Sequence, residues 1–132
     1  MKTFAEFGLE PKVLQAITEL GFEESTPIQD KSIPVALTGS DLIGQAQTGT
    51  GKTAAFGIPL ISKIPVSEDR IVALIMTPTR ELAIQVAEEI GKLSRYKGTR
   101  SLPIYGGQDI GRQIRALKKK TANYYRNARA FA

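Results

Sequence analysis

A glycine-rich turn followed by lysine and threonine carries the clearest chemistry in this chain. It comprises residues 46–53, namely Ala46, Gln47, Thr48, Gly49, Thr50, Gly51, Lys52 and Thr53. In such a turn the backbone N–H groups point at phosphate oxygens, and the following helix adds its positive N-terminal end. Lys52 supplies an ammonium to the outer phosphates, and Thr53 supplies a hydroxyl to Mg²⁺. The segment predicts a site for ATP with Mg²⁺. The alternative is an ordinary strand-to-helix turn with a surface lysine.

Composition excludes several other kinds of site. The chain has 132 residues, of which 42% are hydrophobic, and this suits one globular domain. It contains no cysteine and no histidine, so disulfides, thiolate metal sites and histidine general bases are excluded. Because the sequence shows no long apolar span and no signal-peptide pattern, we expect a soluble protein of the cytoplasm.

Positive charge is concentrated toward the end of the sequence. The formal net charge is +5, from 18 basic and 13 acidic residues. No acidic residue follows Gly111, whereas seven basic residues do: Arg112, Arg115, Lys118, Lys119, Lys120, Arg126 and Arg129. A run of this kind suits a phosphate-binding surface, and it equally suits a solvated helix face.

Helix and strand signals alternate along most of the chain. Helices are expected over residues 12–20, 28–39, 53–61, 80–95 and 108–119, and strands over 42–43, 72–76 and 102–105. The alternation predicts an α/β fold, with a parallel sheet, flanking helices and ligand loops at the carboxyl ends of the strands. No strand is expected after Lys120, so the predicted sheet is incomplete and has an unpaired edge.

Two residues upstream of the turn could recognise a base. A glutamine amide donates and accepts hydrogen bonds at once, which suits the edge of adenine, and Gln29 follows Thr26 and Pro27. Phe4 offers a ring for stacking. The alternatives are an exposed helix residue for Gln29 and a core residue for Phe4.

In this order and spacing, these motifs resemble one family. Downstream of the turn the same pattern continues with Pro78, Thr79, Arg80, Glu81 and Leu82, and then with Gly106 and Gly107. Residues 2–120 closely resemble the first RecA-like domain of bacterial DEAD-box ATP-dependent RNA helicases. Ala46, which departs from the general phosphate-loop pattern, is typical of that family. The resemblance implies an incomplete RecA-like P-loop NTPase domain over residues 1–120.

The resemblance also implies roles for individual residues. Phe4, Thr26 and Gln29 would recognise adenine within residues 4–29, and residues 46–53 would hold ATP, with Lys52 and Thr53 as catalytic residues and Thr53 at Mg²⁺. Residues 78–82 and 106–107 would contact the sugar-phosphate backbone of single-stranded or duplex RNA. Such binding is salt-sensitive, and we expect no base sequence preference, no DNA specificity and no membrane partner. Ser25, where the family usually has proline, is expected to loosen its turn slightly.

Residues 121–132 do not continue the resemblance. The family would continue after Lys120 with a strand and a Thr-Pro-Gly-Arg loop, then the Asp-Glu-Ala-Asp and Ser-Ala-Thr motifs and a second domain, none of which is in this sequence. One permitted coding of the tail, read one base later, translates as Pro-Gln-Ile-Ile-Ile-Gly-Thr-Pro-Gly-Arg-Leu. We therefore expect a one-base insertion in the preceding lysine codons and an out-of-frame tail. A natural divergent tail is the alternative.

The motifs that this sequence lacks determine what we expect of its ATP hydrolysis. Without them the chain is expected to be an N-terminal helicase fragment that does not hydrolyse ATP. The alternatives are a non-catalytic nucleotide- or RNA-binding module and a non-functional frameshift product.

Overall fold

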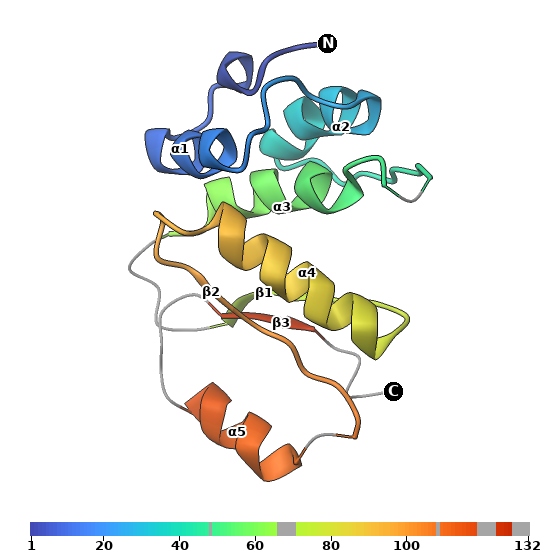
Figure 1. The fold of residues 1–132 in the computed structure, drawn as a ribbon, viewed down its shortest axis with the longest axis vertical. Coiled ribbons are helices and arrows are strands. Elements are labelled where there is room, and N and C mark those ends of the chain that lie inside the picture. Colours follow the sequence, from blue (N-terminus) through green and yellow to red (C-terminus); the bar gives the residue numbers. More distant parts are fainter. Residues whose placement is uncertain (48, 66–70, 108, 119–123, 128–132) are drawn as a thin grey trace. The chain divides into compact units, whose positions relative to one another are not determined.

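The computed structural model describes residues 1–47, 49–65, 71–107, 109–118 and 124–127. Its elements, in chain order, are η1 (Phe4–Phe7), α1 (Pro11–Glu19), α2 (Pro27–Leu37), α3 (Lys52–Lys63), β1 (Ile71–Ile75), α4 (Arg80–Leu93), β2 (Arg100–Leu102), α5 (Ile110–Lys118) and β3 (Tyr124–Asn127) (Figure 1). The chain divides into a first unit, residues 1–63 and 92–97, and a second unit, residues 64–91 and 98–132.

The first unit is a layer of helices whose apolar faces meet. Both α1 and α2 begin at a proline, because the fixed φ and the missing N–H of this residue suit the first helical position. α2 packs against α3, and α1 contacts both α3 and η1. The side chains at the centre are fully enclosed, with 0% exposure for Val13, Ile17, Ile33, Ile58 and Ile61.

The N-terminal strand segment closes over the turn before α2. Thr3 and Glu24 form an isolated antiparallel bridge. The N–H of Ser25 donates to the carbonyl of Lys2 at 2.9 Å, and its hydroxyl lies 3.0 Å from the same oxygen and 3.3 Å from the Asp30 carboxylate. Ser25 thus makes hydrogen bonds that proline could not make, through its backbone N–H and its hydroxyl. The expected slight loosening of the turn relative to proline stays a prediction.

A buried lysine fastens the turn after α4 to α1 and α3. Lys97 is 3% exposed, and its ammonium is hydrogen-bonded to the Glu10 carboxylate and, at 3.1 Å, to the Ser62 carbonyl. Glu10 is the residue that precedes α1, and Ser62 lies in the last turn of α3. Nearby, the hydroxyl of Tyr96 donates to Glu19, and this hydrogen bond raises the pKa of Tyr96 above its ordinary value.

The second unit is built on a parallel sheet in the order β1-β3-β2. Tyr124, at the start of β3, is in register with Ile71 of β1 and with Arg100 of β2. Parallel strands need crossover connections, which α4 and α5 supply. Figure 1 shows these two helices on opposite sides of the sheet. The Ser101 hydroxyl donates to the Ala87 carbonyl at 2.8 Å and so fastens β2 to α4.

Three features of the sheet differ from the sequence-based expectation. The strand expected over residues 102–105 is β2, which spans Arg100–Leu102, so residues 103–105 lie outside it. Residues 42–43 form no strand, and none of the described strands pairs with them; Leu42 is 45% and Ile43 is 99% exposed. A strand needs a partner for its backbone groups, and apolar residues alone do not supply one. Conversely, residues 124–127 form the central strand, although no strand was expected after Lys120. Tyr124 and Tyr125 favour strands, a signal that the search for apolar alternation missed.

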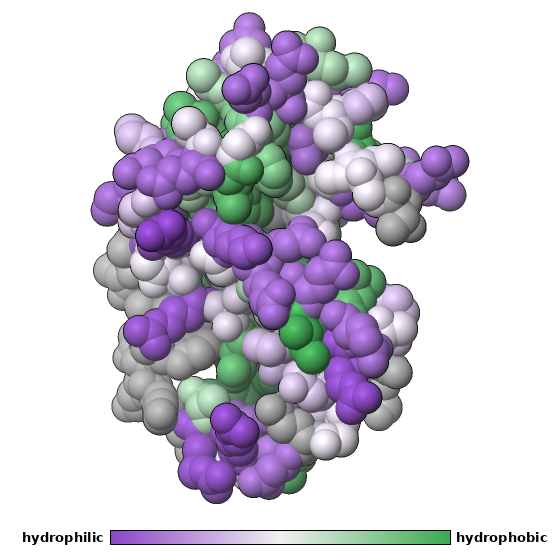
Figure 2. Space-filling model, viewed as in Figure 1, coloured by the Kyte–Doolittle hydropathy of each residue, from purple (hydrophilic) through white to green (hydrophobic). Residues whose placement is uncertain are grey.

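The surface is mostly hydrophilic on the face drawn in Figure 2, with apolar side chains in separate patches. Exposed large apolar residues of the described chain include Phe56, Ile110 and Ile114. Among the described residues, no helix is long and apolar enough to cross a membrane.

Candidate nucleotide and nucleic-acid sites

The glycine-rich turn leads directly into the N-terminus of α3. Gly49 and Gly51 have φ values of 79° and 85°, a backbone conformation that favours glycine. The Thr50 hydroxyl donates to the Gln47 carbonyl, and the Ala55 N–H donates to the Gly51 carbonyl at 3.1 Å, which is the first helical hydrogen bond. Thr48 lies outside the described residues. The turn therefore ends where the first N–H groups of α3 have no partner within the helix.

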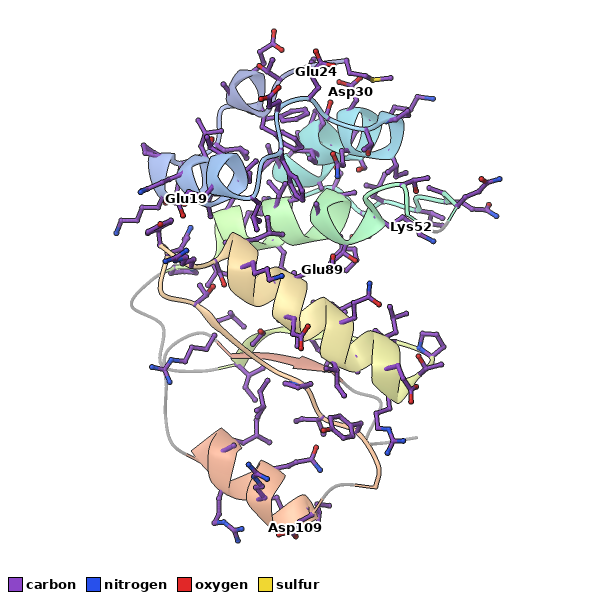
Figure 3. All side chains as sticks on the ribbon, in the orientation of Figure 1. Glu19, Glu24, Asp30, Lys52, Glu89 and Asp109 are labelled. Atoms are coloured by element: carbon purple, nitrogen blue, oxygen red, sulfur yellow. The ribbon has the colours of Figure 1, made fainter. Side chains whose placement is uncertain are left out.

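Lys52 and Thr53 are the first two residues of α3. The Lys52 side chain is exposed and extends from the start of the helix (Figure 3), and Thr53 is half-buried. Main-chain donors, the helix N-terminus and an ammonium thus lie together, which is the donor set that binds phosphate groups. The residues present fit a polyphosphate.

Gln29 joins α2 to the glycine-rich turn of residues 46–53, which we call the phosphate turn from here on. Its Oε1 accepts from the Thr26 N–H at 2.9 Å, and its Nε2 donates to the Gly51 carbonyl, 22 residues away in sequence, at 3.1 Å. Gln29 is 4% exposed, so the alternative of an exposed helix residue is wrong. The sequence signal for this role was the Thr-x-x-Gln spacing at the helix start, in which glutamine caps the preceding N–H, and our sequence analysis missed it.

Phe4 lies in a cluster of aromatic rings rather than at an open surface. It is 2% exposed, and its ring centroid is 5.8 Å from that of Phe7 and 6.1 Å from that of Phe22. This is the core environment that was the alternative for Phe4. Adenine could stack on this ring only after it had turned outward.

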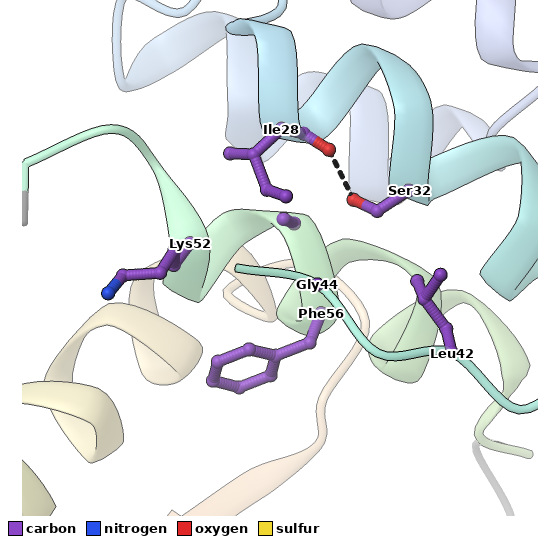
Figure 4. A pocket seen from close by; sticks show the side chains of 7 residues that line it. Ile28, Ser32, Leu42, Gly44, Lys52 and Phe56 are labelled. Carbon is purple, nitrogen blue, oxygen red and sulfur yellow. Dashed lines mark hydrogen bonds between the residues drawn. The ribbon is translucent and has the colours of Figure 1, made fainter. Parts of the chain in front are cut away.

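Two hollows border the phosphate turn. The larger, about 350 Å³, is lined mainly by apolar residues and is shown in Figure 4, with Lys52 at one end and Leu42 at the other. The smaller, about 200 Å³, is lined by residues of α2 and of the turn, including Lys31, Ala46 and Thr50. The turn thus borders open space that a ligand can enter.

Mg²⁺ fits this site only together with nucleotide phosphates. Within the described ranges, no group of three or more His, Cys, Asp or Glu side chains could hold a metal ion. The Thr53 hydroxyl could supply one oxygen, and phosphates and water would have to supply the others that Mg²⁺ requires.

In the second unit, Thr79 directly precedes α4 and sets the geometry of residues 78–82. Its Oγ1 accepts from the Leu82 N–H at 3.2 Å, and its carbonyl accepts from the Ala83 N–H at 3.0 Å. Pro78 and Thr79 form the bend that precedes the helix. Thr79 is therefore a cap residue, and it positions the exposed start of the helix.

Arg80 lies against the Gly106–Gly107 turn. Its Nη1 is 3.1 Å from where a Cβ on Gly107 would be, and Gly107 has a φ of 85°. The Arg80 side chain is 53% exposed, and its Nε is 3.7 Å from a carboxylate oxygen of Glu81, which is 78% exposed. The structure thus brings together residues from both segments that were expected to contact RNA.

The basic run is described only in part. Arg112 and Arg115 are exposed on α5, and Arg115 lies 3.7 Å from the Asp109 carboxylate. The side chains of the other five basic residues lie outside the described part of the chain. Both alternatives for this run, a phosphate-binding surface and a solvated face, stay open.

Comparison with known sequences identifies the family. Residues 26–129 match the family model described as DEAD/DEAH box helicase. The chain is 62% identical over 119 residues to the DEAD-box ATP-dependent RNA helicase CshA of Geobacillus kaustophilus, a match that covers 90% of this chain and 26% of the relative. It is 61% identical to the ATP-dependent RNA helicase CshA of Listeria monocytogenes, covering 90% and 23%. The chain therefore spans about a quarter of the length of these relatives.

Solved structures confirm the RecA-like α/β fold. A DEAD box protein from Methanococcus jannaschii superposes with a TM-score of 0.87 at 47% identity, covering 95% of this chain and 34% of that one. The RNA helicase Prp28 from Chaetomium thermophilum, bound to ADP, gives a TM-score of 0.81 at 39% identity and covers 96% and 32%. The family match includes β3 and extends nine residues beyond residue 120, where the resemblance was expected to end. The chain belongs to the DEAD/DEAH box helicase family.

Proposed function

We propose that this chain binds ATP and RNA as part of a DEAD-box RNA helicase and does not itself hydrolyse ATP. The observation that carries the proposal is the phosphate turn at the N-terminus of α3, closed by the hydrogen bond from Gln29 to Gly51. Residues 78–82 and 106–107 are the proposed contacts to the RNA sugar-phosphate backbone. RNA duplex unwinding is the proposed activity of the full-length parent, in line with the names of the relatives.

The proposal that these 132 residues do not hydrolyse ATP rests on the groups that they lack. Phosphoryl transfer needs groups that position Mg²⁺ and the attacking water and that compensate charge in the transition state, and an arginine finger alone contributes about a thousandfold or more. This sequence contains neither an Asp-Glu-Ala-Asp nor a Ser-Ala-Thr motif. Lys52 and Thr53 would hold the phosphates and the ion, and bound nucleotide would stay intact.

The proposal also includes the origin of residues 121–132 and the cellular location of the protein. The domain boundary at residue 120 and the out-of-frame origin of residues 121–132 are tested by sequencing the encoding DNA across residues 118–121. Codons that cannot yield the shifted translation would exclude the insertion. A cytoplasmic location is proposed because RNA is the expected partner.

Replacing Lys52 tests nucleotide binding. We expect Lys52→Ala to weaken ATP binding by about ten- to a hundredfold, because a charge-assisted contact to phosphate is lost. Lys63→Ala is the matched control, since this exposed lysine lies at the opposite end of α3, and it should bind ATP as the unsubstituted chain does. Binding of a fluorescent ATP analogue with Mg²⁺ gives the dissociation constants, and phosphate release in the same samples should equal that of a protein-free blank.

Other results of these binding experiments would contradict the proposed function or favour one of the two alternative functions. Equal ATP affinities for the Lys52→Ala and Lys63→Ala variants would rule out the phosphate turn as the nucleotide site. RNA binding without ATP binding by a cooperatively melting monomer would indicate an RNA-binding module. Aggregation of the unsubstituted chain would indicate a non-functional product.

A further inference from the structure

A buried glutamine on α5 holds the main chain just before the Gly106–Gly107 turn. Gln113 is 6% exposed. Its Oε1 accepts from the Tyr105 N–H at 3.0 Å, and its Nε2 donates to the Tyr105 carbonyl at 3.3 Å. One amide therefore satisfies both backbone groups of one residue, as a neighbouring strand would. The opposite orientation of the amide would place donor against donor and acceptor against acceptor.

The same helix also fixes the other end of this loop. The Asp109 carboxylate accepts from the Gly111 N–H at 3.0 Å, and the Asp109 carbonyl accepts from the Gln113 N–H at 3.3 Å. Tyr105 and Asp109 are thus both tied to α5, while Gly106 and Gly107 between them are exposed. The two glycines have no side chains that could make contacts, so the position of the turn depends on these hydrogen bonds to α5.

The position of the Gly106–Gly107 turn matters because there is little free space between the turn and Arg80. A Cβ at Gly107 would lie only 3.1 Å from the Arg80 guanidinium. The turn and Arg80 are proposed to contact the same RNA backbone, so the distance between them must stay fixed. A segment that moves freely loses conformational entropy when it binds, and this loss weakens each contact that it makes.

We propose that Gln113 is a positioning residue for RNA binding, which holds the Gly106–Gly107 turn beside Arg80 through the backbone of Tyr105. The inference rests on the proposed function, because it assumes that these segments bind RNA. It adds a buried residue that makes no RNA contact of its own. Gln113 acts by reducing the freedom of the turn before RNA arrives.

Substitution by methionine tests the inference in the full chain. Gln113→Met keeps the length and approximate volume of the side chain and removes both hydrogen bonds to Tyr105. Gln85→Met is the matched control, since Gln85 is exposed on α4 and its side chain bonds to Glu89. The probe is a fluorescein-labelled single-stranded RNA oligonucleotide of mixed sequence, titrated at several salt concentrations.

We expect the RNA dissociation constant of Gln113→Met to rise about tenfold, as two neutral hydrogen bonds permit. Its dissociation constant for ATP should stay within about twofold of that of the unsubstituted chain, because the change is confined to the RNA segment. Hydrogen exchange at the Gly106 and Gly107 amides should become faster. Gln85→Met should change none of these quantities.

Several results would overturn the inference. RNA affinity that is equal in the two methionine variants excludes a positioning role, and parallel losses of RNA and ATP affinity indicate a general loss of structure instead. If Gln113→Met does not fold, the unsubstituted chain provides the test: the Gln113 side-chain amide signals should shift with those of Gly106 and Gly107 on RNA addition, and unchanged signals exclude the role. An unsubstituted chain that binds no RNA refutes the proposed function itself, whereas RNA binding that is indifferent to Gln113 refutes this inference alone.

Discussion

Gly51→Ala should destabilise the first unit by about 2–4 kcal/mol, the sum of a backbone cost and a lost contact. Gly51 has a φ of 85°, where a residue with a Cβ is strained by about 1–2 kcal/mol. The added Cβ would also lie 3.1 Å from both Gln29 Cδ and Thr26 Oγ1, and closer still to Gln29 Nε2. Gln29 would have to move, and its hydrogen bonds to Gly51 and Thr26 would be lost.

Gly49 provides the matched control for this prediction. Its φ is 79°, and a Cβ built there meets nothing within 4 Å. Gly49→Ala should therefore cost only the backbone term, about 1–2 kcal/mol. The free energies of unfolding are compared by urea denaturation of the nucleotide-free chain.

A double-mutant cycle isolates the contact with Gln29. In a Gln29→Ala background the Thr26 hydroxyl oxygen is the one remaining close neighbour given for a Cβ at Gly51, so Gly51→Ala should cost little more than Gly49→Ala does, roughly 1–2 kcal/mol. If Gly51→Ala and Gly49→Ala cost the same in the unsubstituted chain, the link between α2 and the phosphate turn does not contribute to stability.

The helices could be predicted from the sequence because their signals are local. Pro11 and Pro27 mark the first residues of α1 and α2, and the helix expected over residues 53–61 lies within α3. The strand expected over residues 72–76 is confirmed as β1, one residue earlier. Each of these segments carries its own periodicity or terminal residue, so no knowledge of distant partners was needed.

The features that could not be predicted depend on distant residues. The apolar pair Leu42 and Ile43 suits a strand, but a strand forms only where another supplies hydrogen bonds, and periodicity does not show whether one is present. The hydrogen bond from Gln29 to Gly51 joins positions 22 residues apart, and that between Lys97 and Glu10 joins positions 87 apart. Sequence spacing identified the residues of the candidate sites, whereas the side chains that hold those residues in place were visible only in the structure.

The ion pair between Lys97 and Glu10 should respond unequally to the loss of its two members. The Lys97 side chain is 3% exposed, while the Glu10 side chain is 45% exposed. Glu10→Ala would leave a buried positive charge with the Ser62 carbonyl as its remaining acceptor. We expect this to cost about 2–3 kcal/mol, below the range for breaking a fully buried pair because Glu10 is partly in water.

Lys97→Met should cost less than Glu10→Ala, about 1 kcal/mol, because methionine fills a similar volume without a charge and water can solvate the remaining carboxylate. Glu24→Ala, which removes an exposed carboxylate from the same unit, should change stability by no more than about 0.5 kcal/mol. Denaturant unfolding of the three variants at one pH and one salt concentration gives the order. If Lys97→Met is the more damaging change, the ammonium is stabilised chiefly by Ser62 and its other surroundings, and the pair with Glu10 is not what keeps this lysine in the interior.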